Sequence, residues 1–165
     1  MDALPHLLDE KNVALFSRHG VYSQAELRSR YEISLEYYAK AVNIEAETCL
    51  MMAERQIFPA CAKFAGDIGR AVKDIRDAGM EPVAETRLLK FVTDRNVMLF
   101  DAINNLREAI CGTKNSSSAL ENAQYERYII IPAMAKVREI ADDLETLVGR
   151  EYWPFPTYDD LLFNV

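Results

Sequence analysis

Apolar residues recur every three or four positions along most of the chain, which is the spacing of one face of an α-helix. The longest such run lies between residues 23 and 79. Its apolar positions are Leu27, Tyr31, Leu35, Tyr38, Val42, Ala46, Cys49, Ala53, Ile57, Cys61, Phe64, Ile68, Val72 and Ile75. The pattern predicts one very long helix over 23–79, or two helices joined at a kink.

The ends of this helix carry residue types that start and stop helices. Ser23 and Glu26 form an S-x-x-E capping box, in which each side chain accepts a hydrogen bond from the other residue's backbone N–H. Gly79 can adopt the left-handed conformation that closes a helix. Pro59 is the expected position of a bend, because proline lacks an N–H and its ring crowds the carbonyl four residues earlier. A sharp reversal there would give a conventional four-helix bundle.

Two further runs with helical spacing follow, over 82–111 and 118–148. Ser118 and Glu121 repeat the capping box at the start of the second run. The apolar positions are Leu89, Val92, Leu99, Ile103, Leu106 and Ile110 in the first run, and Ile130, Ala133, Val137, Ile140, Leu144 and Leu147 in the second. Asn96 is the polar member of the stripe over 82–111. It either fixes the register of the helices by a hydrogen bond across the core or lies at the margin of the core.

The remaining segments differ in character. Residues 1–22 form a lead-in with a short helix that is expected to stop at Gly20. The run 113–118 (TKNSSS) is a polar loop. Residues 150–165 hold the one tryptophan and two prolines, which disfavour a helix, so an extended aromatic tail is expected. This tail either packs along the helices or docks into a neighbouring molecule.

Together these elements predict an all-α fold. The expected architecture is a single helical domain over 1–165, an elongated antiparallel bundle of three main helices, with a bend in the third helix at Pro132. The second and third helices are too short to cover the whole first helix. Its first half, 23–48, therefore needs cover from the short N-terminal helix, the tail or a partner.

Charge and composition narrow the function classes. The formal net charge is −7 and half of the residues are apolar. This balance argues against a nucleic-acid or anionic-membrane partner, since both select for clustered Lys and Arg. No apolar run approaches the ~18 to 20 residues that span a bilayer, and the first residues have no basic and apolar signal segment. The cytoplasm is the expected location.

Cysteines and histidines give no sign of a reactive or metal site. Cys49, Cys61 and Cys111 are odd in number and lack CxxC spacing, so they are interpreted as plain core thiols. The two histidines, His6 and His19, lie outside the three main helices. A di-iron carboxylate centre, which needs Glu-x-x-His pairs on facing helices, is therefore not expected. Each histidine is interpreted as a surface or capping residue.

The other candidate groups also favour structural roles. Gly66 and Gly69 lack the strand and spacing of a phosphate-binding loop and are expected to let two helices approach closely. Glu45, Glu47 and Glu54 have no histidine partner and are expected on a solvated face. The pairs Asp142-Asp143 and Asp159-Asp160 have no metal-site context. We therefore expect no catalytic, cofactor-binding or metal-binding residue in this chain.

Several stretches resemble type III glutamine synthetases, whose pattern includes SRYEI…K-x-x-NIEA-x-T…MA…I-x-PA and the ending WP-x-PTY-x-DLLF. The matching stretches are Arg30-Tyr31-Glu32-Ile33, Lys40-Ala41-Val42-Asn43-Ile44-Glu45-Ala46-Glu47-Thr48, Met52-Ala53, Ile57-Phe58-Pro59-Ala60 and the ending from Val148 to Phe163. The N-terminal LPHLLDEKNVALFSRHGV also fits what precedes them. The resemblance covers essentially the whole chain, less distinctively in the second and third helices.

The resemblance implies that the chain is the C-terminal helical domain of a longer enzyme. Members of this family join ammonia to glutamate using ATP and a divalent metal such as Mg²⁺, through a γ-glutamyl phosphate, in a catalytic domain that precedes this region. None of the catalytic motifs is present here, so the chain alone is expected to be an inactive fragment of a glutamate–ammonia ligase. It would pack against the catalytic domain and neighbouring subunits of a homo-oligomer.

Two alternatives remain at this point. The chain could be a free-standing helical module that captures another protein through its tyrosine-rich first half-helix and its tail. It could also be an autonomous enzyme, if a pocket held convergent carboxylates with perturbed pKa values.

Overall fold

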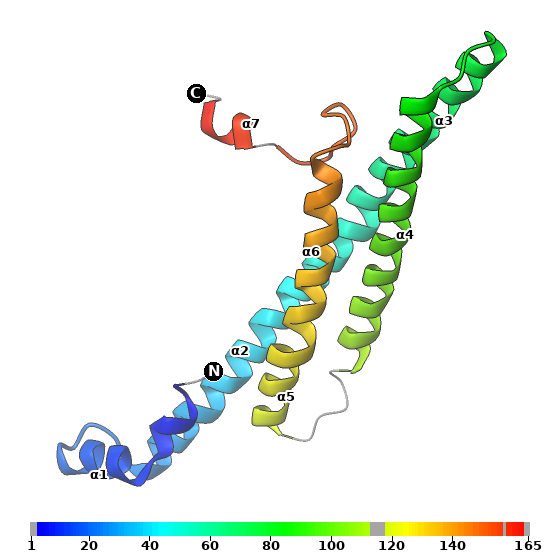
Figure 1. Cartoon of the computed structure of the whole chain (residues 1–165). Coiled ribbons are helices and arrows are strands. Elements are labelled where there is room, and N and C mark those ends of the chain that lie inside the picture. The colour runs from blue at the N-terminus through cyan, green and yellow to red at the C-terminus, as the bar shows by residue number, and fades with distance from the viewer. Residues whose placement is uncertain (1–2, 113–117, 157, 164–165) are drawn as a thin grey trace. The chain divides into compact units, whose positions relative to one another are not determined.

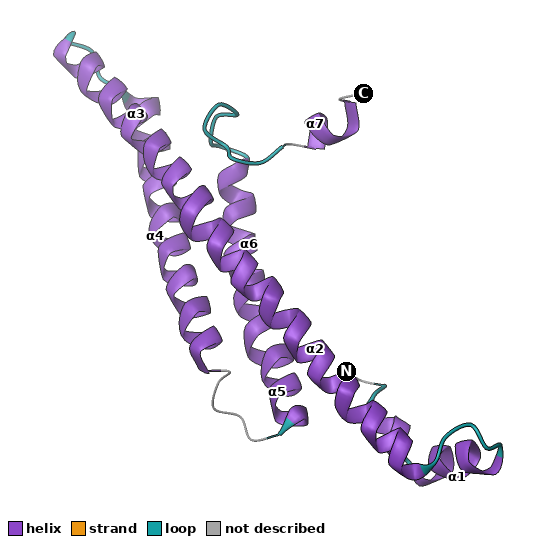
Figure 2. Cartoon of the chain, turned by 180° about the vertical axis from the view of Figure 1, so that it is seen from behind, coloured by secondary structure: helices purple, strands orange, loops and turns teal. Residues whose placement is uncertain are grey.

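A computed structural model describes residues 3–112, 118–156 and 158–163. Helices make up most of this part of the chain, and none of its residues lies in a strand (Figure 1). The same chain seen from behind shows only helices and connecting loops among the elements drawn (Figure 2). The all-α fold class predicted from the apolar spacing is confirmed.

The helices follow the predicted order. They are η1 (Pro5–Leu8), α1 (Glu10–Arg18), α2 (Gln24–Met52), α3 (Phe58–Asp77), α4 (Val83–Gly112), α5 (Ala119–Tyr125), α6 (Ile131–Glu145) and α7 (Tyr158–Phe163). Two five-residue π-helical segments, η2 (Ala53–Ile57) and η4 (Glu126–Ile130), join α2 to α3 and α5 to α6. The last helix of the bundle ends at Glu145 rather than Val148, and most of the predicted loop 113–118 lies outside the described residues.

Each π-helical segment ends two residues before a proline, Pro59 or Pro132. The N–H of Phe58 donates to the carbonyl of Ala53, five residues earlier, and Ile131 donates to Glu126 in the same way. The wider π turn changes the position of the carbonyls that a proline ring would otherwise crowd. The helical backbone therefore continues through both prolines, and the sharp reversal considered at Pro59 is wrong.

The chain divides into two compact units, and each is described by itself. Unit 1 consists of Met1–Glu47 and Glu108–Pro132. Unit 2 consists of Thr48–Arg107 and Ala133–Val165. The boundaries fall inside α2, α4 and α6, so each of these helices contributes residues to both units.

Unit 1 contains η1, α1, most of α2, the last turn of α4, α5 and η4. Its buried apolar side chains are Leu27, Leu35, Val42, Ala46, Ala123 and Ile130. The hydroxyl of Tyr125 donates a hydrogen bond of 2.9 Å to the carbonyl of Ala109 and so ties α5 to the end of α4. Gly20, with φ of 62°, closes α1 where the sequence predicts its end.

The capping box at the start of α2 forms as predicted. The N–H of Ser23 donates to Glu26 Oε2 at 2.7 Å, and the N–H of Glu26 donates to Ser23 Oγ at 3.3 Å. The bond from the Ser23 N–H, and a second one of 2.8 Å from the Ser23 hydroxyl to the same carboxylate oxygen, lower the pKa of Glu26 because they favour its charged form. At the start of α5, the N–H of Glu121 donates to Ser118 Oγ at 3.2 Å, which confirms one half of the second box.

Unit 2 is built on the antiparallel pair α3 and α4, which lie side by side in both views (Figures 1 and 2). Gly79 turns the chain between them with φ of 82°, and the N–H of Met80 bonds to the carbonyl of Ile75 at 3.1 Å. The buried apolar residues are Ala53, Ile57, Cys61, Val72, Val92, Leu99, Ala102, Ile103, Leu106, Val137, Ile140, Ala141, Leu144 and Val148. Arg95 of α4 pairs with Asp143 of α6 at 3.2 Å.

The predicted apolar stripes correspond to the observed core. Every position of the three stripes is buried or half-buried. Asn96 is half-buried, and its Oδ1 has no hydrogen-bond partner in the described part of the chain. That oxygen is buried and makes no hydrogen bond across the described core.

The sequence predicted an extended tail over 150–165, but the described part of this C-terminal segment is not extended throughout. Its first part packs on α3, where the hydroxyl of Tyr152 donates to Asp67 Oδ2 at 2.6 Å and the ring lies 5.2 Å from that of Phe64. Beyond Pro156 no proline restricts the backbone, and Tyr158–Phe163 forms the helix α7. Thr157 and residues 164–165 lie outside the described part of the chain.

Candidate functional site

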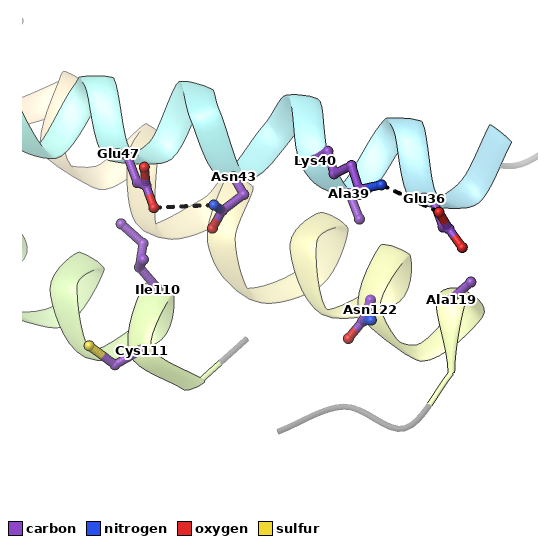
Figure 3. A pocket seen from close by; sticks show the side chains of 9 residues that line it. All are labelled: Glu36, Ala39, Lys40, Asn43, Glu47, Ile110, Cys111, Ala119 and Asn122. Atoms are coloured by element: carbon purple, nitrogen blue, oxygen red, sulfur yellow. Dashed lines mark hydrogen bonds and ion pairs between the residues drawn. The ribbon is translucent and has the colours of Figure 1, made fainter. Parts of the chain in front are cut away.

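A pocket of about 290 Å³ lies in unit 1 between α2 and the facing ends of α4 and α5 (Figure 3). It is lined by Glu36, Ala39, Lys40, Asn43, Glu47, Ile110, Cys111, Ala119 and Asn122. The four polar residues from α2 recur at helical spacing, so they lie on one line along the helix. This line borders the buried stripe of α2.

The charged groups in this pocket interact with neighbours on their own helix. Lys40 Nζ lies 3.4 Å from Glu36 Oε2, and Asn43 Nδ2 donates to Glu47 Oε1 at 3.3 Å. On the opposite wall, Oδ1 of Asn122 is buried and has no hydrogen-bond partner among the described residues. The pocket can hydrogen-bond a polar group, but it contains no nucleophile next to a base and no histidine.

Two of the three cysteines, Cys49 and Cys61, lie at least partly in the core, as expected for plain core thiols. Burial raises the pKa of Cys61 to about 11 and also raises that of Cys49, which is half-buried. A thiol with a raised pKa is protonated near neutral pH and is a poor nucleophile. Cys111 is exposed at the pocket, contrary to the expectation that all three thiols lie in the core.

Both histidines lie in the N-terminal lead-in. His6 is exposed, and its Nδ1 is 3.1 Å from Asp9 Oδ2. His19 is exposed at the C-terminal end of α1. These are the surface and capping positions predicted for them.

The acidic residues singled out from the sequence do not converge on one centre within either unit. Glu45 is exposed, and Glu47 accepts the hydrogen bond from Asn43. In unit 2, Glu54 pairs with Arg107 at 2.9 Å. Each of the last two carboxylates thus has a nearby partner.

The close helix approach expected at Gly66 and Gly69 is wrong. A Cβ placed on Gly66 would meet nothing within 4 Å, and one on Gly69 would lie 4.0 Å from Leu89 Cδ2. Larger side chains such as Leu89 therefore set the spacing between α3 and its neighbour, and neither glycine is required for packing.

Sequence reasoning missed Glu126, which is completely buried at the start of η4. The signal was present, because Glu126 lies three residues after Ala123 and four before Ile130, both of which are buried. Extending the apolar stripe of the third helix backwards from Ile130 would have placed this carboxylate inside the core.

The described residues show neither a candidate metal-ion cluster nor a candidate membrane span. In that part of the chain, no three His, Cys, Asp or Glu side chains gather closely enough to hold a metal ion. None of the described helices combines the length and apolar character needed to cross a membrane.

The chain is similar in sequence to glutamine synthetases. Residues 1–76 match the family model of the glutamine synthetase C-terminal domain. A glutamine synthetase from Butyrivibrio fibrisolvens is 29% identical to the chain and covers 99% of it, and one from Bacteroides fragilis (strain YCH46) is 24% identical over 99% of it. The first 76 residues are thus similar to the C-terminal domain of glutamine synthetase, and the chain as a whole is similar to part of these two enzymes.

A further relative carries the type in its name. A type-3 glutamine synthetase from Dictyostelium discoideum is 32% identical over 98% of the chain. The resemblance to the C-terminal helical domain of type III glutamine synthetases, found in the sequence motifs, is confirmed. The chain spans only about a quarter of the length of these relatives, 23% to 24%.

Proposed function

We propose that this chain acts as the noncatalytic C-terminal helical domain of a type III glutamine synthetase, with a role in architecture and subunit packing. The observation that carries the proposal is the match of the whole chain to only 23% to 24% of each relative. The remaining three quarters of such an enzyme offer ample length for a separate catalytic domain.

The full-length enzyme would ligate ammonia to glutamate at the expense of ATP, in the cytoplasm, with a divalent metal ion. We assign that chemistry to the preceding domain and no step of it to this chain. The partners of this chain would be the catalytic domain of the same polypeptide and neighbouring subunits.

The local chemistry also supports a structural role. Lys40 pairs with Glu36, Glu54 pairs with Arg107, and burial raises the pKa of the Cys61 thiol. Exposed pairs of this kind contribute only a fraction of a kcal/mol each, whereas the apolar residues of both units provide most of the stabilisation. The Glu54–Arg107 pair joins η2 to α4, and the Lys40–Glu36 pair lies within α2, so both have a place in the structure of the helices.

Isothermal titration calorimetry tests the noncatalytic assignment. The 165-residue chain is titrated with ATP, with Mg²⁺ and with glutamate, separately and together. We expect no binding heat above that of dilution. Micromolar affinity for ATP would contradict the assignment and would favour an autonomous site in this chain.

A free-standing protein-interaction module is the alternative, and one observation favours it. Helix α7 exposes Leu161, Leu162 and Phe163 at 67%, 67% and 77%, and large exposed apolar groups mark interaction surfaces. A pull-down with the tagged chain separates the two functions. Recovery of synthetase chains supports the C-terminal domain, whereas specific recovery of an unrelated partner, lost when α7 is removed, supports the module.

A further inference from the structure

A second apolar stripe runs along α2 in unit 1, on the side of the helix that faces away from the core. It consists of Ile33, Tyr37 and Ile44, which are exposed at 62%, 75% and 63%. Since an α-helix turns ~100° per residue, these three residues lie within about 40° of one another and about 180° from Leu35 and Val42. Helix α2 is therefore apolar on two opposite sides.

A helix with two apolar sides is typical of a position between two packing partners. The stripe with Leu35 and Val42 is buried in unit 1, so one partner is already present. On the other side, Ile33 forms part of a groove of about 400 Å³ whose walls include Glu26 and Arg30. Ile33 is the one apolar residue in the lining of this groove, so the polar residues beside it border the stripe at that end.

Two observations indicate which molecule covers this stripe. The relatives are about four times as long as the chain, and the matching family model is that of a C-terminal domain, so in such an enzyme the remaining polypeptide precedes residue 1. Both views place the N-terminal end of the described chain beside the first half of α2 (Figures 1 and 2). The preceding polypeptide would thus join the chain in unit 1, the unit that carries the exposed stripe.

We infer that Ile33, Tyr37 and Ile44 form the docking surface for the polypeptide that precedes residue 1 in the full-length synthetase. This inference rests on the proposed function and names the surface through which the domain contacts the rest of its own chain. A covalently joined segment has a high effective concentration at a nearby surface, so it has an advantage over a second copy.

Hydroxyl-radical footprinting with mass spectrometry tests the inference on Tyr37. The labelling rate of Tyr37 is compared between the 165-residue chain and the full-length enzyme, each normalised to the unfolded peptide. Because side chains at the core of an interface are almost fully buried, we expect the rate for Tyr37, 75% exposed here, to fall about tenfold in the full-length enzyme. Equal rates in the two proteins would overturn the inference.

A matched pair of variants tests whether the stripe itself is responsible. Ile44→Arg places a charge on the stripe, whereas Glu45→Arg places the same side chain at the adjacent exposed position, ~100° around the helix. In the full-length enzyme, Ile44→Arg should return the labelling of Tyr37 towards the rate of the isolated chain, and Glu45→Arg should leave it protected. Protection that survives Ile44→Arg would contradict the assigned surface. Circular dichroism of both variant chains confirms that α2 is still helical.

Photocrosslinking distinguishes the possible occupants. Benzoylphenylalanine replaces Tyr37 in full-length enzyme assembled from a mixture of ¹⁴N and ¹⁵N chains. Crosslinked peptides of a single isotope that join Tyr37 to sequence preceding residue 1 support the inference. Mixed-isotope pairs, or no crosslink, overturn it. Either of these results leaves the proposed noncatalytic function intact, because calorimetry tests that function separately.

Discussion

The substitution Tyr152→Phe tests how the C-terminal segment is held on α3. It removes the hydroxyl that donates to Asp67 Oδ2 at 2.6 Å and keeps the ring that contacts Phe64. A hydrogen bond to a charged group contributes about 1.5 to 3 kcal/mol, and we expect the lower end because this one is only partly buried. For a chain of this size, about 1.5 kcal/mol corresponds to a Tm lower by roughly 3 to 6 °C.

Urea unfolding measures this effect with two probes. Trp153, the one tryptophan of the chain, follows the C-terminal segment by fluorescence, and circular dichroism follows the helices. Tyr128→Phe is the matched control, because the Tyr128 side chain is 64% exposed. If Tyr152→Phe changes the free energy of unfolding no more than this control does, the hydrogen bond to Asp67 does not hold the segment.

Three further predictions concern the core, a helix start and the thiols. Leu99→Ala, at a residue with no exposed surface, should lower the free energy of unfolding by about 2 to 5 kcal/mol in urea, and a loss below about 1 kcal/mol would place Leu99 outside a packed core. Ser23→Ala should cost about 1 kcal/mol by removing the cap of α2. Because the pKa of Glu26 is lowered in the folded chain, the stabilisation from this carboxylate is present above its unfolded pKa and is lost as pH falls through the lowered value. Urea titrations at several pH values should show this loss in the wild type and a smaller one in Ser23→Ala; equal pH dependence would refute the link. At pH 8, Cys111 should react with a thiol reagent much faster than Cys61, whose pKa is about 11, and equal rates would contradict the burial of Cys61.

The helices and the core could be predicted from the sequence because their signals are local. Spacing of three and four residues places Leu35 and Leu99 inside a helical core whatever lies around them, and both are buried. The cap at Ser23 and the turn at Gly79 depend on a few neighbouring residues, and both form as predicted.

The features that were missed depend on contacts or on backbone geometry that the spacing does not encode. Proline signals a disturbed helix, but the sequence did not show that a π turn would accommodate Pro59 and Pro132 within a continuous helix. Glu126 was missed because a carboxylate was assumed to lie outside the core. The exposed stripe with Tyr37 lies on a helix whose buried stripe satisfies the amphipathic pattern, so a second apolar side did not stand out.

Sedimentation velocity on the full-length enzyme tests the central claim most directly. The full-length polypeptide is compared with a version that lacks residues 1–165 of the present numbering, and ATP binding by each is measured on the same samples. The account predicts that the shortened enzyme loses the oligomeric assembly proposed for the full-length protein but still binds ATP through the proposed catalytic domain. An unchanged assembly would contradict the packing role, and loss of ATP binding by a shortened protein that remains folded would contradict the noncatalytic assignment.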